Sequence, residues 1–297
     1  MSALTLIRNK DQFRKNLTLF ILLLPGLLWI LMLIVIPQFG MFIDSFKFRP
    51  IYHKKGFTLE NYAYFFTNLL YVKIFLKTLG VAILITFVSF LVCFPIAFYI
   101  AKVAKPDVAR KIFILVIIPF WVSELIRTFS WMIILGDHGV INRFLMMLNL
   151  RTEPVTLLYN NFSVTVGLVY NYLLFMILPI YSTLEGMDNS LMEAAQDLGA
   201  NRFNVMRRIV IPYSLPGIMS GSIMVFMLSV GTYIAPTLLG GTKEIWFTEL
   251  IYNKFFKAMN WRLGSALAFT LLILTLLFIF LVIKIAGLKL TDVIEEE

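Results

Sequence analysis

Six long apolar runs dominate this sequence of 297 residues and limit what the chain can fold into. They are Leu17–Ile36, Thr78–Ala101, Ile112–Leu135, Asn161–Leu184, Tyr213–Leu239 and Leu263–Ile283. A helix that crosses a bilayer needs about 20 mostly apolar residues, and each run is long enough. Because the runs are continuously apolar and do not alternate, they predict helices and not the strands of a barrel. We therefore expect an all-α integral membrane protein with six transmembrane helices.

The composition favours the same class of protein. Hydrophobic residues make up 60% of the chain and charged residues only 14%, whereas a soluble domain carries about 25% charged residues. The net charge of +9 comes from Lys and Arg scattered between the apolar runs. They form no patch that could follow phosphates, so we exclude nucleic acid and expect contacts with anionic membrane lipid. Cys93 stands alone in an apolar run, which indicates a packed thiol and excludes a disulfide within the chain.

Six spans place both termini on one side of the membrane. Short Lys and Arg clusters beside the first three runs favour the cytoplasm, although the whole-chain count differs little between the two sides. The first run is too long for a signal peptide and lacks a cleavage site. We predict a cytoplasmic segment at 1–16, a transmembrane domain at 17–286 and a cytoplasmic tail at 287–297. The long connections at 37–77, 136–160 and 240–262 carry aromatic residues, which predicts short helices at the membrane surface.

One polar segment, SLMEAAQDLGANRFNVMRRIVIP at 190–212, separates the fourth run from the fifth. Ser190 and Glu193 have the spacing of a capping box, and Gly199 suits a left-handed helix end. The apolar positions of this first short helix are Leu191, Ala194, Ala195 and Leu198, which share one face. A second short helix is expected from Asn201, with Phe203, Met206, Ile209 and Val210 on one face. These residues alone fit either docking into a groove of a partner protein or lying on lipid headgroups.

The same segment resembles the EAA motif in permease subunits of bacterial ABC importers. It has the E-A-A triplet, the glycine, the isoleucine and the proline of the motif at their spacing, with Ile211 in place of the usual Leu. Three other stretches are similar to polyamine-type permeases. They are PFWVSELIRTFSWMIILG at 119–136, VYNYLLFMILPIYSTLE at 169–185 and YIAPTLLGG at 233–241.

The resemblance implies a type I ABC importer permease fold with cytoplasmic coupling helices, in the bacterial inner membrane. The implied ATPase-coupling residues are Glu193, Ala194, Ala195, Gly199, Arg202, Ile209 and Pro212. The implied partners are a second permease, expected to be a different chain, two ATP-binding subunits and a periplasmic substrate-binding protein. ATP and Mg would be bound by the ATP-binding subunits. This chain has no G-x-x-x-x-G-K-[ST] motif, so we expect a permease without a cofactor or catalytic activity of its own.

Candidate substrate residues follow from polar groups within the apolar runs. Glu124 and Arg127 lie on one face of the third run, and charges inside a membrane are costly. They fit contact with a cationic solute, a structural pair, or a place at the outer interface. The other candidates are Tyr170, Asn171, Tyr172, Thr232 and Tyr233. The tyrosine rings, with the polar groups beside them, could hold an ammonium group, and helix packing is the alternative role for each residue.

Gly217 and Gly221 form a G-x-x-x-G pattern, which permits close approach of membrane helices. We interpret the fifth run as a pore-side helix packed against the second permease, with a contact inside this chain as the alternative.

Two other function classes fit the sequence less well. A membrane enzyme needs clustered catalytic groups, but His53 and His138 are far apart and no metal site is expected. An ATP-independent channel would have no use for the segment at 190–212. The resemblance and Glu124 favour a polyamine as the solute, while opines, amino-acid-like solutes, phosphonates and iron remain open.

Overall fold

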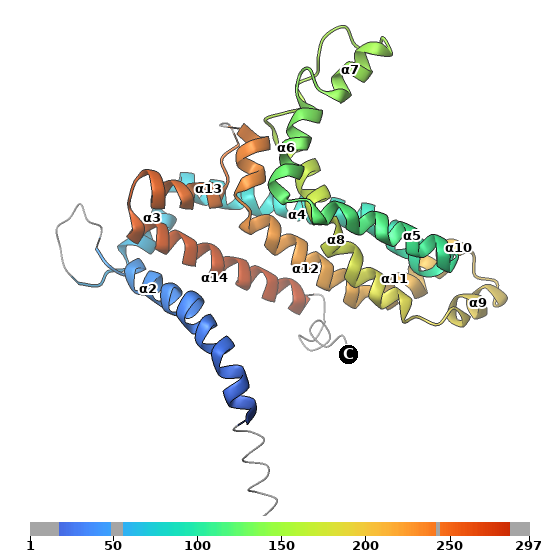
Figure 1. Cartoon of the computed structure of the whole chain (residues 1–297), viewed down its shortest axis with the longest axis horizontal. Helices are drawn as coiled ribbons and strands as arrows, with labels where there is room; N and C mark the ends of the chain where they lie inside the picture. Colours follow the sequence, from blue (N-terminus) through green and yellow to red (C-terminus); the bar gives the residue numbers. More distant parts are fainter. Residues whose placement is uncertain (1–17, 49–55, 242–243, 286–297) are drawn as a thin grey trace, which may run out of the picture. The chain divides into compact units, whose positions relative to one another are not determined.

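The computed structural model describes residues 18–48, 56–241 and 244–285 (Figure 1). The predicted segments 1–16 and 287–297 lie outside the described residues, as does His53. The predicted all-α fold is confirmed, because the described residues form helices and, besides them, one isolated β-bridge between Lys47 and Phe57. The chain divides into two compact units, Met1–Phe65 with Lys254–Thr270, and Phe66–Asn253 with Leu271–Glu297.

The first unit contains a long apolar helix, Thr18–Ser45, which includes a π-helical turn, η1 (Leu31–Val35), and α2 (Ile36–Ser45). Helix α3 (Glu60–Thr67) follows. The side-chain amide of Asn61 donates to the carbonyls of Ser45 at 2.9 Å and Lys47 at 2.8 Å. The end of a helix leaves carbonyls without partners, so this asparagine satisfies them and holds α3 against the end of α2.

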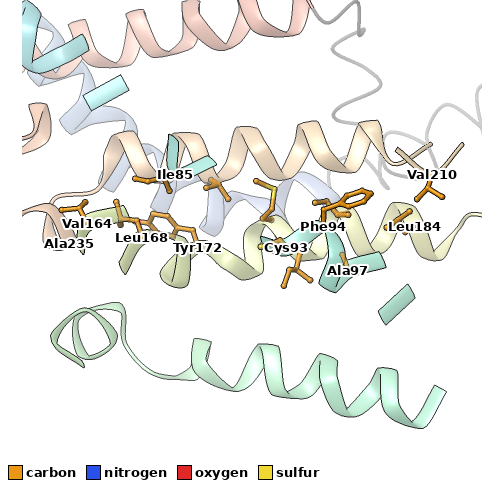
Figure 2. Packing of buried hydrophobic residues seen from close by; sticks show 14 of the residues in the cluster. Ile85, Cys93, Phe94, Ala97, Val164, Leu168, Tyr172, Leu184, Val210 and Ala235 are labelled. Atoms are coloured by element: carbon orange, nitrogen blue, oxygen red, sulfur yellow. The ribbon is translucent and has the colours of Figure 1, made fainter. Parts of the chain in front are cut away.

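The second unit is built around three helices, α4 (Leu69–Phe98), α8 (Asn161–Glu185) and α12 (Leu215–Gly231), which pack against one another. A π-helical turn, η3 (Tyr99–Val103), extends α4. Figure 2 shows the core between these helices, where buried side chains of α4 and α8 face each other. Cys93 is a free, buried thiol 3.6 Å from the Leu173 carbonyl, as predicted for a packed cysteine.

Shorter helices and turns complete the second unit. They are α5 (Pro106–Ile117), η4 (Ile118–Trp121), α6 (Glu124–Leu135), α7 (Val140–Met147), α9 (Ser190–Asp197), α10 (Arg202–Val205), η5 (Met206–Val210), α11 (Ile211–Tyr213), η6 (Pro236–Gly240) and α13 (Phe247–Tyr252). Another π-helical turn, η8 (Asn253–Lys257), and α14 (Trp261–Ile285) belong partly to each unit. Short helices therefore occur in all three long connections where the sequence predicted them.

Four helices of the described residues are long and apolar enough to cross a membrane, and there are six if each of two bent pairs counts as one span. The prediction of a continuous helix over Ile112–Leu135 was wrong, because this stretch bends by 96°. Pro119 lies in the tight turn η4, and Val122 and Ser123 are extended before α6 begins at Glu124. Proline lacks a backbone N–H, and its ring clashes inside a helix, which favours this break.

The fifth apolar run is also shorter as a helix than predicted. The chain bends by 65° at Ser214, and α12 ends at Gly231 because Thr232 is extended. Ser214 is fully buried, and its hydroxyl donates to the Val210 carbonyl at 2.8 Å. This hydroxyl therefore gives the Val210 carbonyl a hydrogen-bond donor at the bend. Thr232 and Tyr233 follow the opposite end of α12.

The glycines of α12 pack inside this chain. An added Cβ at Gly217 would lie 2.4 Å from the Pro179 carbonyl oxygen and the same distance from Thr183 Oγ1 of α8. At Gly221 it would lie 3.1–3.2 Å from Met176 of the same helix. These distances support the alternative of a contact inside this chain for the two glycines, while packing of the same span against a second permease stays a prediction. The small residues let α12 approach α8 closely.

Candidate functional site

The predicted substrate residues of three separate apolar runs meet in one polar cluster. The Tyr172 hydroxyl of α8 donates to Glu124 Oε1 of α6 at 3.2 Å. The Asn171 side-chain amide donates to Thr128 Oγ1 at 3.0 Å. The Thr232 side chain, just after α12, also contacts the Tyr172 hydroxyl. We call these five residues, together with Arg127, the polar cluster.

Arg127 is held by groups other than Glu124. It is only 9% exposed, and its Nη1 donates to the Asn171 carbonyl at 3.3 Å. Its guanidinium carbon lies 4.6 Å from the ring centroid of Phe120, a cation–π contact. The ion pairs within 4.0 Å that the described part of the chain contains do not include Glu124 with Arg127. The half-buried Glu124 carboxylate is therefore not neutralised by direct contact with this arginine.

The other two predicted aromatic residues lie outside the polar cluster. Tyr170 makes an edge contact with Trp131, with ring centroids 5.6 Å apart. Tyr233 stacks on Tyr252 of α13, with ring centroids 4.5 Å apart and an angle of 26° between the rings.

Sequence reasoning missed Thr128, Phe120 and Tyr252. Thr128 lies one turn after Glu124, so helical spacing could have found it. Phe120 and Tyr252 have no local sequence signal, because their contacts with Arg127 and Tyr233 depend on where helices end in the folded chain.

Helix α9 begins at Ser190 and ends at Asp197, and Gly199 has a φ of +85°, as the predicted left-handed stop requires. The predicted capping box is wrong. Ser190 is the first helical residue, and its backbone N–H donates to Asp188 Oδ1 at 2.9 Å. This hydrogen bond lowers the pKa of the Asp188 carboxyl. The carboxylate also suits the positive end of the helix dipole, so Asp188 provides the capping interaction expected of Ser190.

The apolar positions of α9 divide between two faces. Leu198 is 90% exposed, and Leu191 and Ala194 are exposed too. Ala195 faces inward, where it packs with Met192 against the core. The prediction that these four residues share one face is therefore wrong at Ala195. We call Leu191, Ala194 and Leu198 the outer face of α9.

The second short helix begins as predicted, because the Asn201 side chain accepts from the Asn204 backbone N–H at 2.8 Å. Its predicted apolar face is wrong at one position. Phe203 is 70% exposed, while Val205 is buried in its place. The π-helical turn η5 adds a residue to one turn and so changes which side chains share a face. Ile209 packs against the core and Pro212 lies in α11, where it opens the next helix.

A cavity of about 510 Å³ lies between α9, η5 and the end of α4. Its charged lining residues are Lys102, Glu193 and Arg202. The Lys102 ammonium donates to the Met187 carbonyl, which ties the end of η3 to the loop before α9. The motif residues Glu193 and Arg202 therefore line a hollow beside the transmembrane core. The outer face of α9 is exposed and points away from that core.

The described residues contain no group of three or more His, Cys, Asp or Glu side chains that could hold a metal ion. His138 lies in the turn between α6 and α7.

Solved structures of two transporters are similar to this fold. A bacterial ABC transporter that imports the acidic polysaccharide alginate matches with a TM-score of 0.74 at 18% identity, over 92% of this chain and 96% of that one. The MetNI methionine ABC transporter matches with a TM-score of 0.51 at 19% identity, over 73% of this chain and 92% of that one. At these identities the likeness establishes the fold alone.

Sequence relatives are closer, although no family model matches the chain. The spermidine/putrescine transport system permease protein PotB of Haemophilus influenzae is 35% identical over 85% of this chain and 88% of its own length. PotB of Escherichia coli is 33% identical over 82% and 89%. The inner membrane ABC transporter permease protein YdcU of Escherichia coli is 31% identical over 90% and 88%. The chain belongs to the PotB family of ABC transporter permease proteins.

Proposed function

We propose that this chain is the permease subunit of a bacterial importer for polyamines such as spermidine or putrescine. Family membership supports the permease role, and the names of the PotB relatives support the solute class. The observation that carries the proposal is the Glu124 carboxylate, which lies beside Tyr172 at the break of an apolar run and has no ion pair with Arg127. A polyamine offers the ammonium groups that such a carboxylate and ring attract.

The polar cluster lies where helices end. Glu124 begins α6 and Thr232 follows α12, so neither side chain lies in the middle of a continuous helix. Broken helices in transporters commonly border the substrate path, because freed backbone groups need polar partners. The two bent pairs supply the third and fifth of six spans in this arrangement. Six spans place both termini on one side, and the Lys and Arg clusters beside the first three apolar runs favour the cytoplasm for that side. The connections holding α7 and α13 are then periplasmic.

Helix α9 transmits the energy of ATP hydrolysis in this proposal. Its outer face docks into a cleft of an ATP-binding subunit. The left-handed turn at Gly199 ends the helix, and Arg202 lines the hollow beside it. Each of two ATP-binding subunits contacts one permease, and ATP and Mg are bound there. The second permease is a different but related chain, and a periplasmic binding protein delivers the solute.

The direct test is the ATPase activity of the assembled complex in lipid nanodiscs with its binding protein. We expect stimulation by spermidine or putrescine and none by an opine, a phosphonate, an amino acid or ferric iron at equal concentration. Stimulation by one of those solutes instead would support the importer role and contradict the assignment of a polyamine as the solute. Equal activity with and without every solute would overturn both.

A further inference from the structure

Helix α13 carries a carboxylate with one oxygen that has no hydrogen-bond partner in the described part of the chain. Glu249 Oε2 is shielded from solvent and has no hydrogen-bond donor among the described residues. The nearby Glu244, by contrast, forms an ion pair with Lys77 of α4. A shielded oxygen without a donor costs free energy, so the Glu249 carboxylate suits a cation that comes from outside the chain.

Aromatic rings lie next to this carboxylate. Glu249, Tyr252 and Asn253 are three and four residues apart, so they share one helical side, and Asn253 Oδ1 is also shielded and without a donor. Tyr252 stacks on Tyr233 with ring centroids 4.5 Å apart. Burial raises the pKa of the Tyr233 phenol, and the nearby Tyr252 and Glu249 add to that rise. Two oxygen acceptors and two ring faces are therefore close together.

The surrounding contacts keep α13 in place. Its first residue, Phe247, is fully buried, and its backbone N–H donates to Thr78 Oγ1 of α4 at 3.0 Å. The Thr248 hydroxyl donates to the Thr232 carbonyl at 2.6 Å. Glu249 thus stands on a helix fixed at its start to α4 and to the end of α12.

This second position adjoins the polar cluster through Thr232. The Thr232 side chain contacts Tyr172, which is bonded to Glu124, while its carbonyl accepts from Thr248. The next residue, Tyr233, begins the aromatic stack. Thr232 therefore connects the two carboxylates, through Tyr172 to Glu124 and through Thr248 to the neighbouring Glu249. A polyamine has several ammonium groups separated by short methylene chains, so it can use more than one such position.

We propose that Glu249, Asn253 and the stacked Tyr233 and Tyr252 form a second ammonium-binding position, which holds one end of a polyamine whose other end is held at Glu124. The inference rests on the proposed function, because it assigns a second contact to the same solute. The carboxylate binds the ammonium group and the two tyrosine rings cover the methylene chain beside it. A monoamine can occupy only one of the two positions at a time.

Retention of radiolabelled spermidine by the complex tests this position. The complete complex, with its binding protein, is trapped by ATP and vanadate and separated from free solute. We expect Glu249→Gln to lower retention by about tenfold or more, as expected when a charge-assisted contact is lost. Glu153→Gln, which removes an equal charge from an exposed loop residue, is expected to retain spermidine as the unmodified complex does.

Three further variants separate binding from folding. Tyr252→Phe keeps the ring and is expected to retain spermidine, whereas Tyr252→Leu removes the ring and is expected to retain less. If Glu249→Gln retains as much spermidine as Glu153→Gln, the second position is wrong while the proposed function stands. If the unmodified complex is stimulated by no polyamine, the proposed function itself fails. Glu249→Asp keeps the charge, so it is expected to restore part of the retention; loss equal to that of Glu249→Gln would contradict a role for charge.

Discussion

At the scale of single residues, two charged side chains one helical turn apart have different environments. Arg127 is buried against the Phe120 ring and the Asn171 carbonyl. Glu124 accepts one hydrogen bond from Tyr172 and is half-buried. The arginine therefore has structural partners within the chain, while the carboxylate keeps capacity for a further donor, because an ionised carboxylate can accept several hydrogen bonds.

The first prediction concerns Glu124→Gln. The amide oxygen can still accept from Tyr172, so assembly with the partner subunits is expected to be unchanged. The negative charge is lost, and we expect uptake of spermidine into proteoliposomes to fall about tenfold, the size of one charge-assisted hydrogen bond. The measurement is uptake rate per assembled complex, with Glu153→Gln as the control. Uptake equal to that control would remove Glu124 from the substrate path.

The second prediction concerns Gly217→Ala. The added methyl group would meet the Pro179 carbonyl oxygen of α8, and backbone cannot move away as a flexible side chain can. We expect a loss of about 1–3 kcal/mol in stability, as for other overpacked cores. Gly80→Ala is the matched control, since an added Cβ there has open space in the middle of α4. Thermal unfolding in detergent compares the two, and an equal Tm for both would show that α12 does not need this close approach.

At the scale of elements, the start of α9 depends on Asp188 rather than on a capping box. The third prediction is that Asp188→Ala weakens this start, because Ser190 loses the acceptor of its backbone N–H. We expect faster hydrogen exchange in the first turn of α9, read by mass spectrometry of peptides spanning 188–198. Asp188→Asn keeps a side-chain oxygen and is expected to exchange more slowly than Asp188→Ala. Exchange in Asp188→Ala as slow as in the unmodified chain would disprove the cap.

The same residue predicts how α9 responds to acid. The Asp188 pKa is lowered in the folded chain, so its contribution is present above the unfolded pKa and is lost as the pH falls through the folded value. An unperturbed aspartate has a pKa of about 3.9, so the loss begins in that range and is complete below the lowered pKa of Asp188. Hydrogen exchange measured as the pH is lowered through this range should become faster in the first turn of α9 of the unmodified chain, beyond the intrinsic effect of pH. Asp188→Ala should show no such change.

The sequence predicted elements better than it predicted where they bend. Continuous apolarity located the fourth run to within one residue of α8, since nothing in it disturbs the helix badly enough to end it. Continuous apolarity did not reveal the helix breaks at 122–123 and 232, because the chain remains apolar on both sides of each break. Pro119 was a visible signal that the apolar count ignored. The capping error at Ser190 arose because Asp188 competes from outside the four-residue pattern.

At the scale of the whole molecule, the EAA resemblance and the apolar runs led to the family, and the relatives confirm it. The polar cluster was partly predictable, since Glu124, Asn171 and Tyr172 are unusual in apolar runs. Tyr252 and Glu249 were not, because their position depends on the Thr248 contact with the end of α12, sixteen residues away in sequence. Proximity of that kind is set by packing and leaves no local pattern.

The last prediction concerns how energy enters the molecule. Leu198 is 90% exposed beside Gly199, so it contributes little to the folded chain itself. An apolar side chain that becomes buried contributes about 1.5–3 kcal/mol to association. We therefore expect Leu198→Glu to reduce copurification of the ATP-binding subunit by at least about tenfold, with membrane insertion and Tm unchanged. Leu150 is another exposed leucine, outside α9, so Leu150→Glu should leave copurification of the ATP-binding subunit unchanged.

If both variants retain the ATP-binding subunit, then α9 does not dock through its outer face. If both lose it, the effect is one of charge or folding. Loss confined to Leu198→Glu would mean that this exposed leucine is needed for contact with the ATPase.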